Sequence, residues 1–130
     1  MEISESFAEP LSWEKKSFAH LALVLSDGTP HCTPLWFDYD GTHLIINSAR
    51  GRVKDNAMRQ SPHVALAISD PDNPYRYIQI RGRVTEITEE GARDMIDHLS
   101  AKYKGTLYEY YENETRVTYK ILPESIQTNI

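Results

Sequence analysis

Basic side chains gather in one short stretch of an otherwise acidic chain, whose net charge is −5. Four of them fall within ten positions: Arg50, Arg52, Lys54 and Arg59. Ser48 and this stretch follow an apolar run at 43–46 that is typical of a buried strand, and they lead into a helix-forming segment at 52–60. Unbonded N–H groups in the first turn, the helix dipole and the basic side chains would all favour a phosphate there. The alternative is a solvated basic helix that binds no ligand.

A second candidate lies in the strand predicted before the basic stretch, at Thr33-Pro34-Leu35-Trp36. Pro34 cannot donate to a strand ladder, so this strand is expected at a sheet edge or at a bulge. The indole N–H of Trp36 needs a partner if the ring is buried. The segment fits a platform for a planar ring, with free backbone groups meeting the ring's edge. It fits core packing at a barrel corner equally well, and the local sequence leaves both alternatives open.

Apolar periodicity and turn signals predict the elements that position these residues. Strands are expected at 18–26, 31–39, 43–48, 63–69, 75–87 and 117–121. Two Asp-Gly pairs, at 27–28 and 40–41, predict hairpins and therefore an antiparallel meander. Helices are expected at 5–16, at 52–60 and from an N-cap at Thr88 to a stop at Gly105. The tail SIQTNI, at 125–130, is expected to be loose unless a partner holds it. About six antiparallel strands with short helices predict a mainly β protein in which a small barrel closes or covers the sheet edges.

Composition narrows the class of protein. At 130 residues, 40% of them hydrophobic, the chain is expected to form one globular domain over residues 1–130. It has no apolar run long enough to cross a bilayer and no leader pattern, so we expect no membrane span and a cytoplasmic location. The acidic balance argues against a nucleic-acid partner. Cys32 is the only cysteine, which excludes an internal disulfide, and we expect it to be a small buried thiol. The five histidines show no metal-ligand spacing, so no metal site is expected.

Three segments, in this order and spacing, resemble a known family. They are HCTPLWFDYDG, INSARGRVKDNAMRQSPHVAL and DPDNPYRYIQIRGRV. The chain from about residue 18 to 104 is similar to the pyridoxamine-phosphate-oxidase-like split β-barrel flavoproteins, and within them to the subgroup that uses the deazaflavin coenzyme F420. The resemblance implies a six-stranded antiparallel split barrel and a homodimer with two cofactors in clefts at the subunit interface. Pyridoxamine-phosphate oxidases proper carry a longer C-terminal segment with substrate-binding basic residues, so oxidation of vitamin B6 is not expected.

The resemblance also implies roles for particular residues. Ser48, Arg52 and Lys54 would hold the cofactor phosphate, and the charge argument above adds Arg50. The ring would be cradled by Thr33, Pro34, Leu35 and Trp36, and Tyr77 would approach from the partner subunit, with Arg76 as a second candidate there. The implied activity is hydride transfer between coenzyme F420 and a small electrophilic substrate. The alternatives are an FMN-dependent oxidoreductase of the same fold and a cofactor-binding protein without turnover. No side chain is assigned as a catalytic acid or base.

Overall fold

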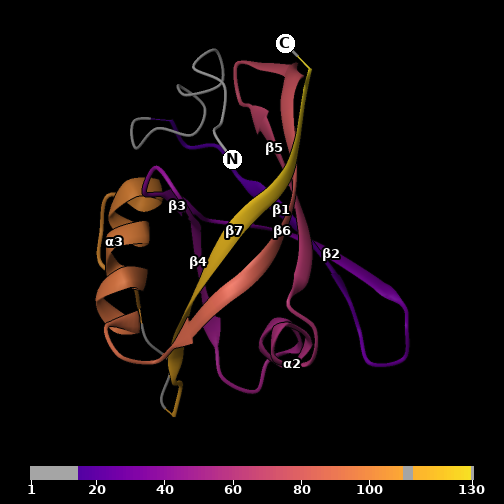
Figure 1. Ribbon diagram of the computed structural model, residues 1–130. Coiled ribbons are helices and arrows are strands. Elements are labelled where there is room, and N and C mark those ends of the chain that lie inside the picture. Colours follow the sequence, from indigo (N-terminus) through magenta and orange to yellow (C-terminus); the bar gives the residue numbers. More distant parts are fainter. Residues whose placement is uncertain (1–14, 110–112, 130) are drawn as a thin grey trace.

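The computed structural model of the protein describes residues 15–109 and 113–129. In this part of the chain one antiparallel sheet accompanies two helices (Figure 1). The strands are β1 (Ala19–Val24), β2 (Pro30–Leu35), β3 (Asp38–Tyr39), β4 (Leu44–Ala49), β5 (His63–Asp70), β6 (Asn73–Thr88) and β7 (Arg116–Asn129), and the helices are α2 (Val53–Gln60) and α3 (Ala92–Lys104). The predicted helix at 5–16 falls almost wholly outside the described residues.

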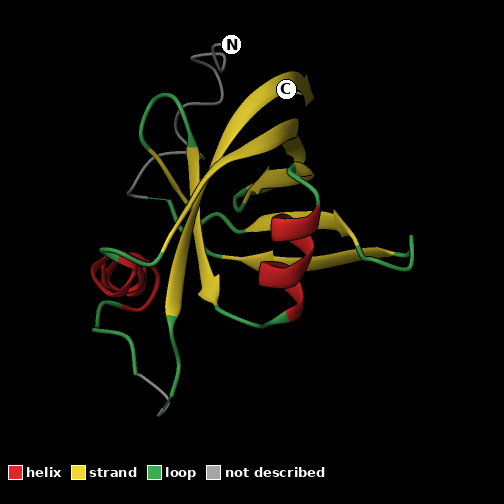
Figure 2. Cartoon of the chain, turned by 60° about the horizontal axis from the view of Figure 1, so that its bottom comes forward, coloured by secondary structure: helices red, strands yellow, loops and turns green. Residues whose placement is uncertain are grey.

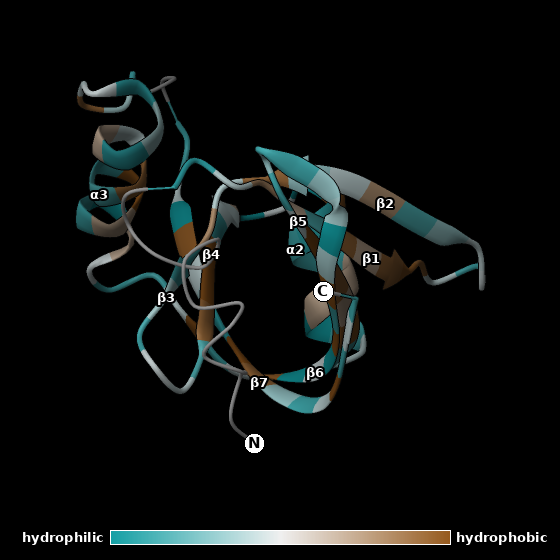
Figure 3. Cartoon of the chain, turned by 90° about the horizontal axis from the view of Figure 1, so that it is seen from above, coloured by the Kyte–Doolittle hydropathy of each residue, from teal (hydrophilic) through white to brown (hydrophobic). Residues whose placement is uncertain are grey.

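The sheet runs in the order β2-β1-β5-β6-β7-β4-β3, and every pair in it is antiparallel. The strands curl into an open ring when seen from above, with α3 outside β3 and β4 (Figure 3). The two end strands, β2 and β3, are joined only by Trp36 and Phe37, so the chain crosses from one edge of the sheet to the other at this point. The prediction of a mainly β, antiparallel protein is confirmed, and Pro34 does lie in an edge strand.

Three predicted boundaries were wrong. The strand expected at 31–39 breaks after Leu35, which is why the sheet has seven strands and not six. The third helix begins at Ala92 after Gly91, whose φ is +74°, because β6 continues through Thr88. The tail is not loose, since β7 runs to Asn129 and pairs with the first half of β6, as in the pair Ile80 and Ile126.

Side chains facing the inside of the curl form the core. Leu21, Ile46, Leu66, Ile80 and Tyr119 are all at most 1% exposed. Burial of this apolar surface is the main contribution to stability. Helix α3 packs on β4 and β7, whereas α2 packs on β1 and β4, apart from α3 (Figure 2). The core therefore fixes α2 against β1 and β4. Strand β2, which carries further candidate site residues, pairs with β1.

The outer face of the sheet is lined by small residues around the hairpin of β1 and β2. Cys32 is exposed on this face, so the expectation of a buried thiol was wrong. The reason is that no second layer among the described residues covers the outer face of the sheet at β2. On the next strands Ala22 and Ala65 are only half-buried for the same reason.

Candidate functional site

A basic cavity of about 440 Å³ lies between β2 and the start of α2. Its lining residues are His31, Thr33, Gly51, Arg52, Val53 and Lys54. Two buried atoms in this lining, the Nδ1 of His31 and the Oγ1 of Thr33, have no hydrogen-bond partner in the described part of the chain. Buried polar atoms are almost always bonded, so two orphans among the residues that line one cavity mark it as a candidate binding site.

The first turn of α2 faces this cavity, and some of its backbone N–H groups are hydrogen-bonded while others are not. The N–H of Gly51 bonds to the Asp55 carboxylate at 2.9 Å, and that of Arg52 bonds to the Ala49 carbonyl at 3.2 Å. Those of Val53 and Lys54 have no acceptor among the described residues. The expectation of unbonded N–H groups at this helix start is therefore met at the two residues that line the cavity.

A buried network holds the turn in place from behind. The Asp55 carboxylate, only 1% exposed, also accepts from the Tyr119 hydroxyl at 2.5 Å and from the Nε of Arg59 at 3.0 Å. Burial raises the pKa of Asp55, but the bonds from Tyr119, Gly51 and Arg59 outweigh burial and hold the pKa below its ordinary value. Arg59 is thus committed to this network and does not reach the basic cavity. Asp55 is ionised at neutral pH and ties the turn to β7.

Carboxylates also reach two of the predicted phosphate-binding residues. Arg50 donates to Glu89 at 2.7 Å, and Arg52 donates to Glu114 at 2.7 Å. Lys54 has no carboxylate partner in the part of the chain that the structure describes. Burial, and secondarily the charge of Arg52, lowers the pKa of Lys54. A phosphate beside Lys54 would relieve both effects.

A second, aromatic cavity of about 230 Å³ adjoins the first and lies between the end of β2, β4 and α3. Its lining residues are Phe18, Pro34, Leu35, Trp36, Asn47, Arg52, Ile96, Leu99, Tyr108 and Arg116. The Trp36 ring stacks on Tyr103 with centroids 5.5 Å apart and planes 6° apart, which holds it in one orientation. Arg52 lines both cavities, so they meet at its side chain.

The predicted site residues divide into two groups. Thr33 and Lys54 line the basic cavity, Pro34, Leu35 and Trp36 line the aromatic cavity, and Arg52 lines both. Three others line neither cavity: Ser48, Arg50 and Tyr77. Ser48 is 5% exposed on β4, and Tyr77 pairs with Asn129 at the start of β6, away from α2. Their assigned roles remain predictions.

Sequence reasoning missed Asn47, Tyr108 and Arg116, which complete the aromatic cavity. Arg116 bonds through Nε to the Asn47 amide oxygen at 2.9 Å and through Nη1 to Glu114 at 3.0 Å. Its guanidinium also lies 4.9 Å from the Tyr108 ring centroid. No spacing signal joins residues 47 and 116, which meet only because β4 pairs with β7. The next two tyrosines, Tyr110 and Tyr111, lie outside the described residues.

Comparisons with known proteins decide the family. The sequence matches the family described as pyridoxamine 5'-phosphate oxidase over residues 8–129. The chain belongs to this family. Its members are flavin- or F420-dependent oxidoreductases, and the predicted split-barrel fold is confirmed. No match was found among the curated proteins.

Solved structures of similar proteins support the same assignment. An F420 reductase from Mycobacterium smegmatis is 32% identical with a TM-score of 0.85, and the match covers 96% of this chain and 98% of that one. A Listeria innocua protein described as a candidate pyridoxamine 5'-phosphate oxidase is 24% identical with a TM-score of 0.72, covering 95% of both chains. A conserved hypothetical protein from Mycobacterium tuberculosis is 21% identical with a TM-score of 0.75, covering 97% of this chain and 84% of that one. The last two show likeness of fold alone.

The residues of the basic cavity fit the phosphate of such a cofactor. Two cationic side chains, two unbonded N–H groups and the orphaned Thr33 hydroxyl together form an anion-binding donor set. Within residues 15–109 and 113–129, no three His, Cys, Asp or Glu side chains gather as metal ligands would. None of the helices in these ranges is long and apolar enough to span a membrane.

Proposed function

We propose that this protein is an oxidoreductase that binds coenzyme F420 and transfers a hydride between it and a small electrophilic organic substrate. The observation that carries the proposal is the meeting of a phosphate-binding cavity and an aromatic cavity at Arg52. The 32% identical F420 reductase, matched over nearly its full length, supports the choice of cofactor. We propose that it acts in the cytoplasm, as expected from the sequence.

In this proposal each cavity has its own task. Lys54, Arg52 and the N–H groups at the start of α2 bind the cofactor phosphate, and the Thr33 hydroxyl donates to it. Pro34, Leu35 and Trp36 supply the apolar surface that orients the ring and excludes water from it. When bound, the deazaflavin ring supplies a hydride to an enone, quinone or nitro group of the substrate. Ser48 and Arg50 extend the phosphate site.

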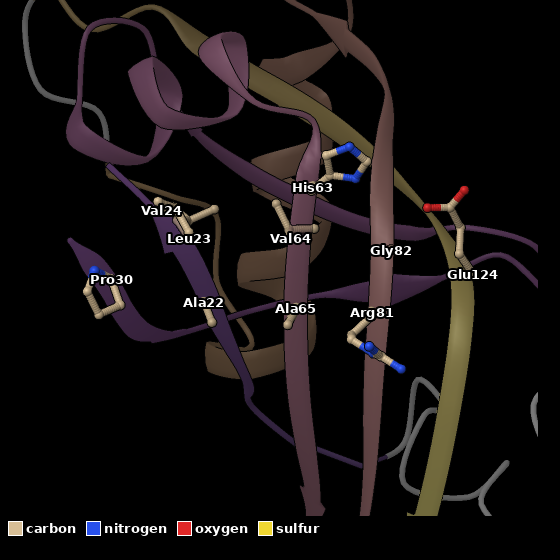
Figure 4. Close-up of a pocket in the computed structure, with 10 residues that line it drawn as sticks. All are labelled: Ala22, Leu23, Val24, Pro30, His63, Val64, Ala65, Arg81, Gly82 and Glu124. Atoms are coloured by element: carbon tan, nitrogen blue, oxygen red, sulfur yellow. The ribbon is translucent and has the colours of Figure 1, made fainter. Parts of the chain in front are cut away.

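We propose further that the working form is a homodimer. Tyr77 is 39% exposed at the start of β6 and lines neither cavity of its own chain, so in this proposal a second copy brings it to a cofactor. The outer face of the sheet offers a surface for that copy. There a groove of about 380 Å³ is lined largely by small apolar side chains of β1, β2 and β5, including Ala22, Pro30 and Ala65, with Arg81 and Glu124 at its rim (Figure 4).

Fluorescence titration of F420 into wild type and variants tests the proposal. Lys54→Ala and Arg52→Ala should each weaken binding roughly tenfold to a hundredfold, because a charge-assisted contact contributes about 1.5–3 kcal/mol. Arg83→Ala is the matched control, since Arg83 is an exposed arginine whose partner is Glu124 on the neighbouring strand. Wild-type affinity in both cavity variants would place the phosphate elsewhere. Sedimentation of the cofactor-loaded protein as a monomer would refute the dimer.

The FMN alternative differs from F420 at the anionic tail, which FMN lacks. Added salt should therefore weaken F420 binding more steeply than FMN binding. Equal salt slopes, or tighter FMN binding at low salt, would favour FMN. Single-turnover mixing of the reduced, loaded protein with an enone or quinone separates an oxidoreductase from a carrier, because a carrier leaves the cofactor reduced.

A further inference from the structure

One face of β2 runs along both cavities of the candidate site. His31, Thr33 and Leu35 are half-buried and alternate with exposed neighbours, so their side chains share this face. His31 and Thr33 line the basic cavity, whereas Leu35 lines the aromatic cavity. Side chains two positions apart on a strand lie roughly 6.6 Å from each other. In the proposed function Leu35 lies at the cofactor ring and Thr33 at its phosphate, so His31 lies one step beyond the phosphate.

The basic cavity has room for more than a phosphate group. Its volume of about 440 Å³ falls within the roughly 300–1,000 Å³ typical of sites that hold a whole small ligand. A third cavity of about 190 Å³ adjoins it, between α2 and the turn after β1, and Val53 lines both. Among the described residues no carboxylate lines either cavity. An anionic ligand can therefore continue past its phosphate here without meeting a negative charge.

His31 has hydrogen-bonding capacity that the described part of the chain leaves unused. Its Nδ1 is buried without a partner, and its Nε2 makes no hydrogen bond within residues 15–109 and 113–129. A neutral imidazole carries one N–H and one acceptor nitrogen. A buried donor without an acceptor is costly, so we expect the proton on Nε2 and not on the buried Nδ1. The Nε2–H is then the group that His31 offers to a ligand.

We propose that His31 recognises the anionic tail of coenzyme F420, with its Nε2–H donating to an anionic oxygen of the tail next to the phosphate. This inference rests on the proposed function, from which it takes the places of the ring and the phosphate. FMN ends at its phosphate and has no group to meet His31. His31 is thus a specificity-determining residue that favours F420 over FMN.

Calorimetric titration with two ligands tests this contact. They are coenzyme F420 and the tail-free deazaflavin phosphate, which has the same ring, ribityl chain and phosphate. His31→Phe keeps an aromatic ring and removes the donor, so it should weaken F420 binding about tenfold and leave the tail-free ligand unchanged. His31→Gln places an amide N–H near the position of Nε2–H and should restore most of the affinity for F420.

Two further variants and one spectrum serve as controls. Thr33→Val should weaken both ligands equally, because both carry the phosphate. His20→Phe should change neither, since His20 is an exposed histidine on β1 that lines none of the three cavities. In nitrogen NMR spectra of the wild-type protein, F420 should shift the His31 Nε2 signal and the tail-free ligand should not. The signal is identified by its absence from His31→Gln.

The outcomes separate this inference from the proposed function. Equal losses for both ligands in His31→Phe, or no loss for either, would overturn the inference alone, provided that the wild-type protein binds F420. An unshifted Nε2 signal in the F420-loaded protein would also overturn it. Failure of the wild-type protein to bind either deazaflavin would overturn the proposed function and this inference with it. A loss confined to F420 and restored in His31→Gln would support His31 as the contact to the tail.

Discussion

The buried bond between Tyr119 and Asp55 is the sharpest point at which to test how the phosphate-binding turn is held. Tyr119 is fully buried on β7, and its hydroxyl donates to the Asp55 carboxylate at 2.5 Å. Tyr119→Phe removes only the hydroxyl and keeps the ring that fills the core. Asp55 then retains two donors, from Gly51 and Arg59.

The expected loss follows from the bond that disappears. A hydrogen bond to a charged group contributes about 1.5–3 kcal/mol, and the variant creates almost no cavity. We therefore expect the free energy of unfolding to fall by about 2 kcal/mol. For a domain of this size that lowers the Tm by roughly 6–10 °C.

Urea denaturation of wild type, Tyr119→Phe, Asp55→Asn and the double variant measures this loss and its origin. The coupling energy of the cycle should exceed about 1 kcal/mol, because both single variants remove the same bond. Tyr119→Phe within about 0.5 kcal/mol of wild type, or additive single effects, would refute the reasoning.

The same variant should change the acid limb of stability. The pKa of Asp55 is depressed in the folded protein, so its stabilisation is present above the unfolded pKa and is lost as pH falls through the folded pKa. Tyr119→Phe raises the folded pKa towards its ordinary value and leaves less stability to lose. The gap between wild type and variant should therefore narrow as pH falls below about 4. A gap independent of pH would mean that the bond does not act through the ionised carboxylate.

Two further predictions concern the core and the phosphate site. Gly82→Ala should lower the free energy of unfolding by about 1–3 kcal/mol in urea denaturation, because the added Cβ would lie 2.8 Å from the Leu122 carbonyl oxygen and 2.9 Å from the Ile121 side chain. A variant as stable as wild type would show that β6 and β7 can move apart at no cost to make room for the Cβ. The pKa of Lys54 is lowered and an anion binds its protonated form, so F420 affinity should fall as pH rises through that pKa. Lys54→Arg should remove this pH dependence. A pH profile of binding that is unchanged in Lys54→Arg would exclude Lys54 from the phosphate site.

Local sequence patterns were sufficient to predict most of the strands and helices. The alternation of Ile78, Ile80 and Val84 along β6 predicted the buried face, and all three are at most 9% exposed. The Asp-Gly pairs predicted both hairpins, where Gly28 and Gly41 have φ of +83° and +95°. These signals depend on backbone sterics and on the period of two along a strand, which neighbours in sequence already determine.

Pairing between distant segments decided what local patterns left open. The tail reads as polar and loose, yet residues 125–129 pair with the first half of β6. That half carries the buried core residues Ile78 and Ile80 and is paired with β5 on its other side, so the tail pairs with its remaining edge. The strand expected at 31–39 breaks at Trp36 and Phe37 because the chain must cross between the two edges of the curled sheet there. A short window of sequence contains no signal for either the pairing of the tail or the break in the strand.

The sequence by itself determined that four basic residues lie around the start of a helix, after a strand that contains Pro34. It therefore predicted an anion-binding site there. Tertiary structure decided which cations serve it. Glu89 pairs with Arg50, 39 positions away in the chain, and Glu114 pairs with Arg52, 62 positions away. Asp55 pairs with Arg59. Of the four cations, only Lys54 has no carboxylate partner among the described residues. The same folding brought Arg116 to the aromatic cavity through the pairing of β4 with β7. The physical reason is that residue type sets a charge, whereas its effect depends on partners and burial, which exist only once distant segments meet.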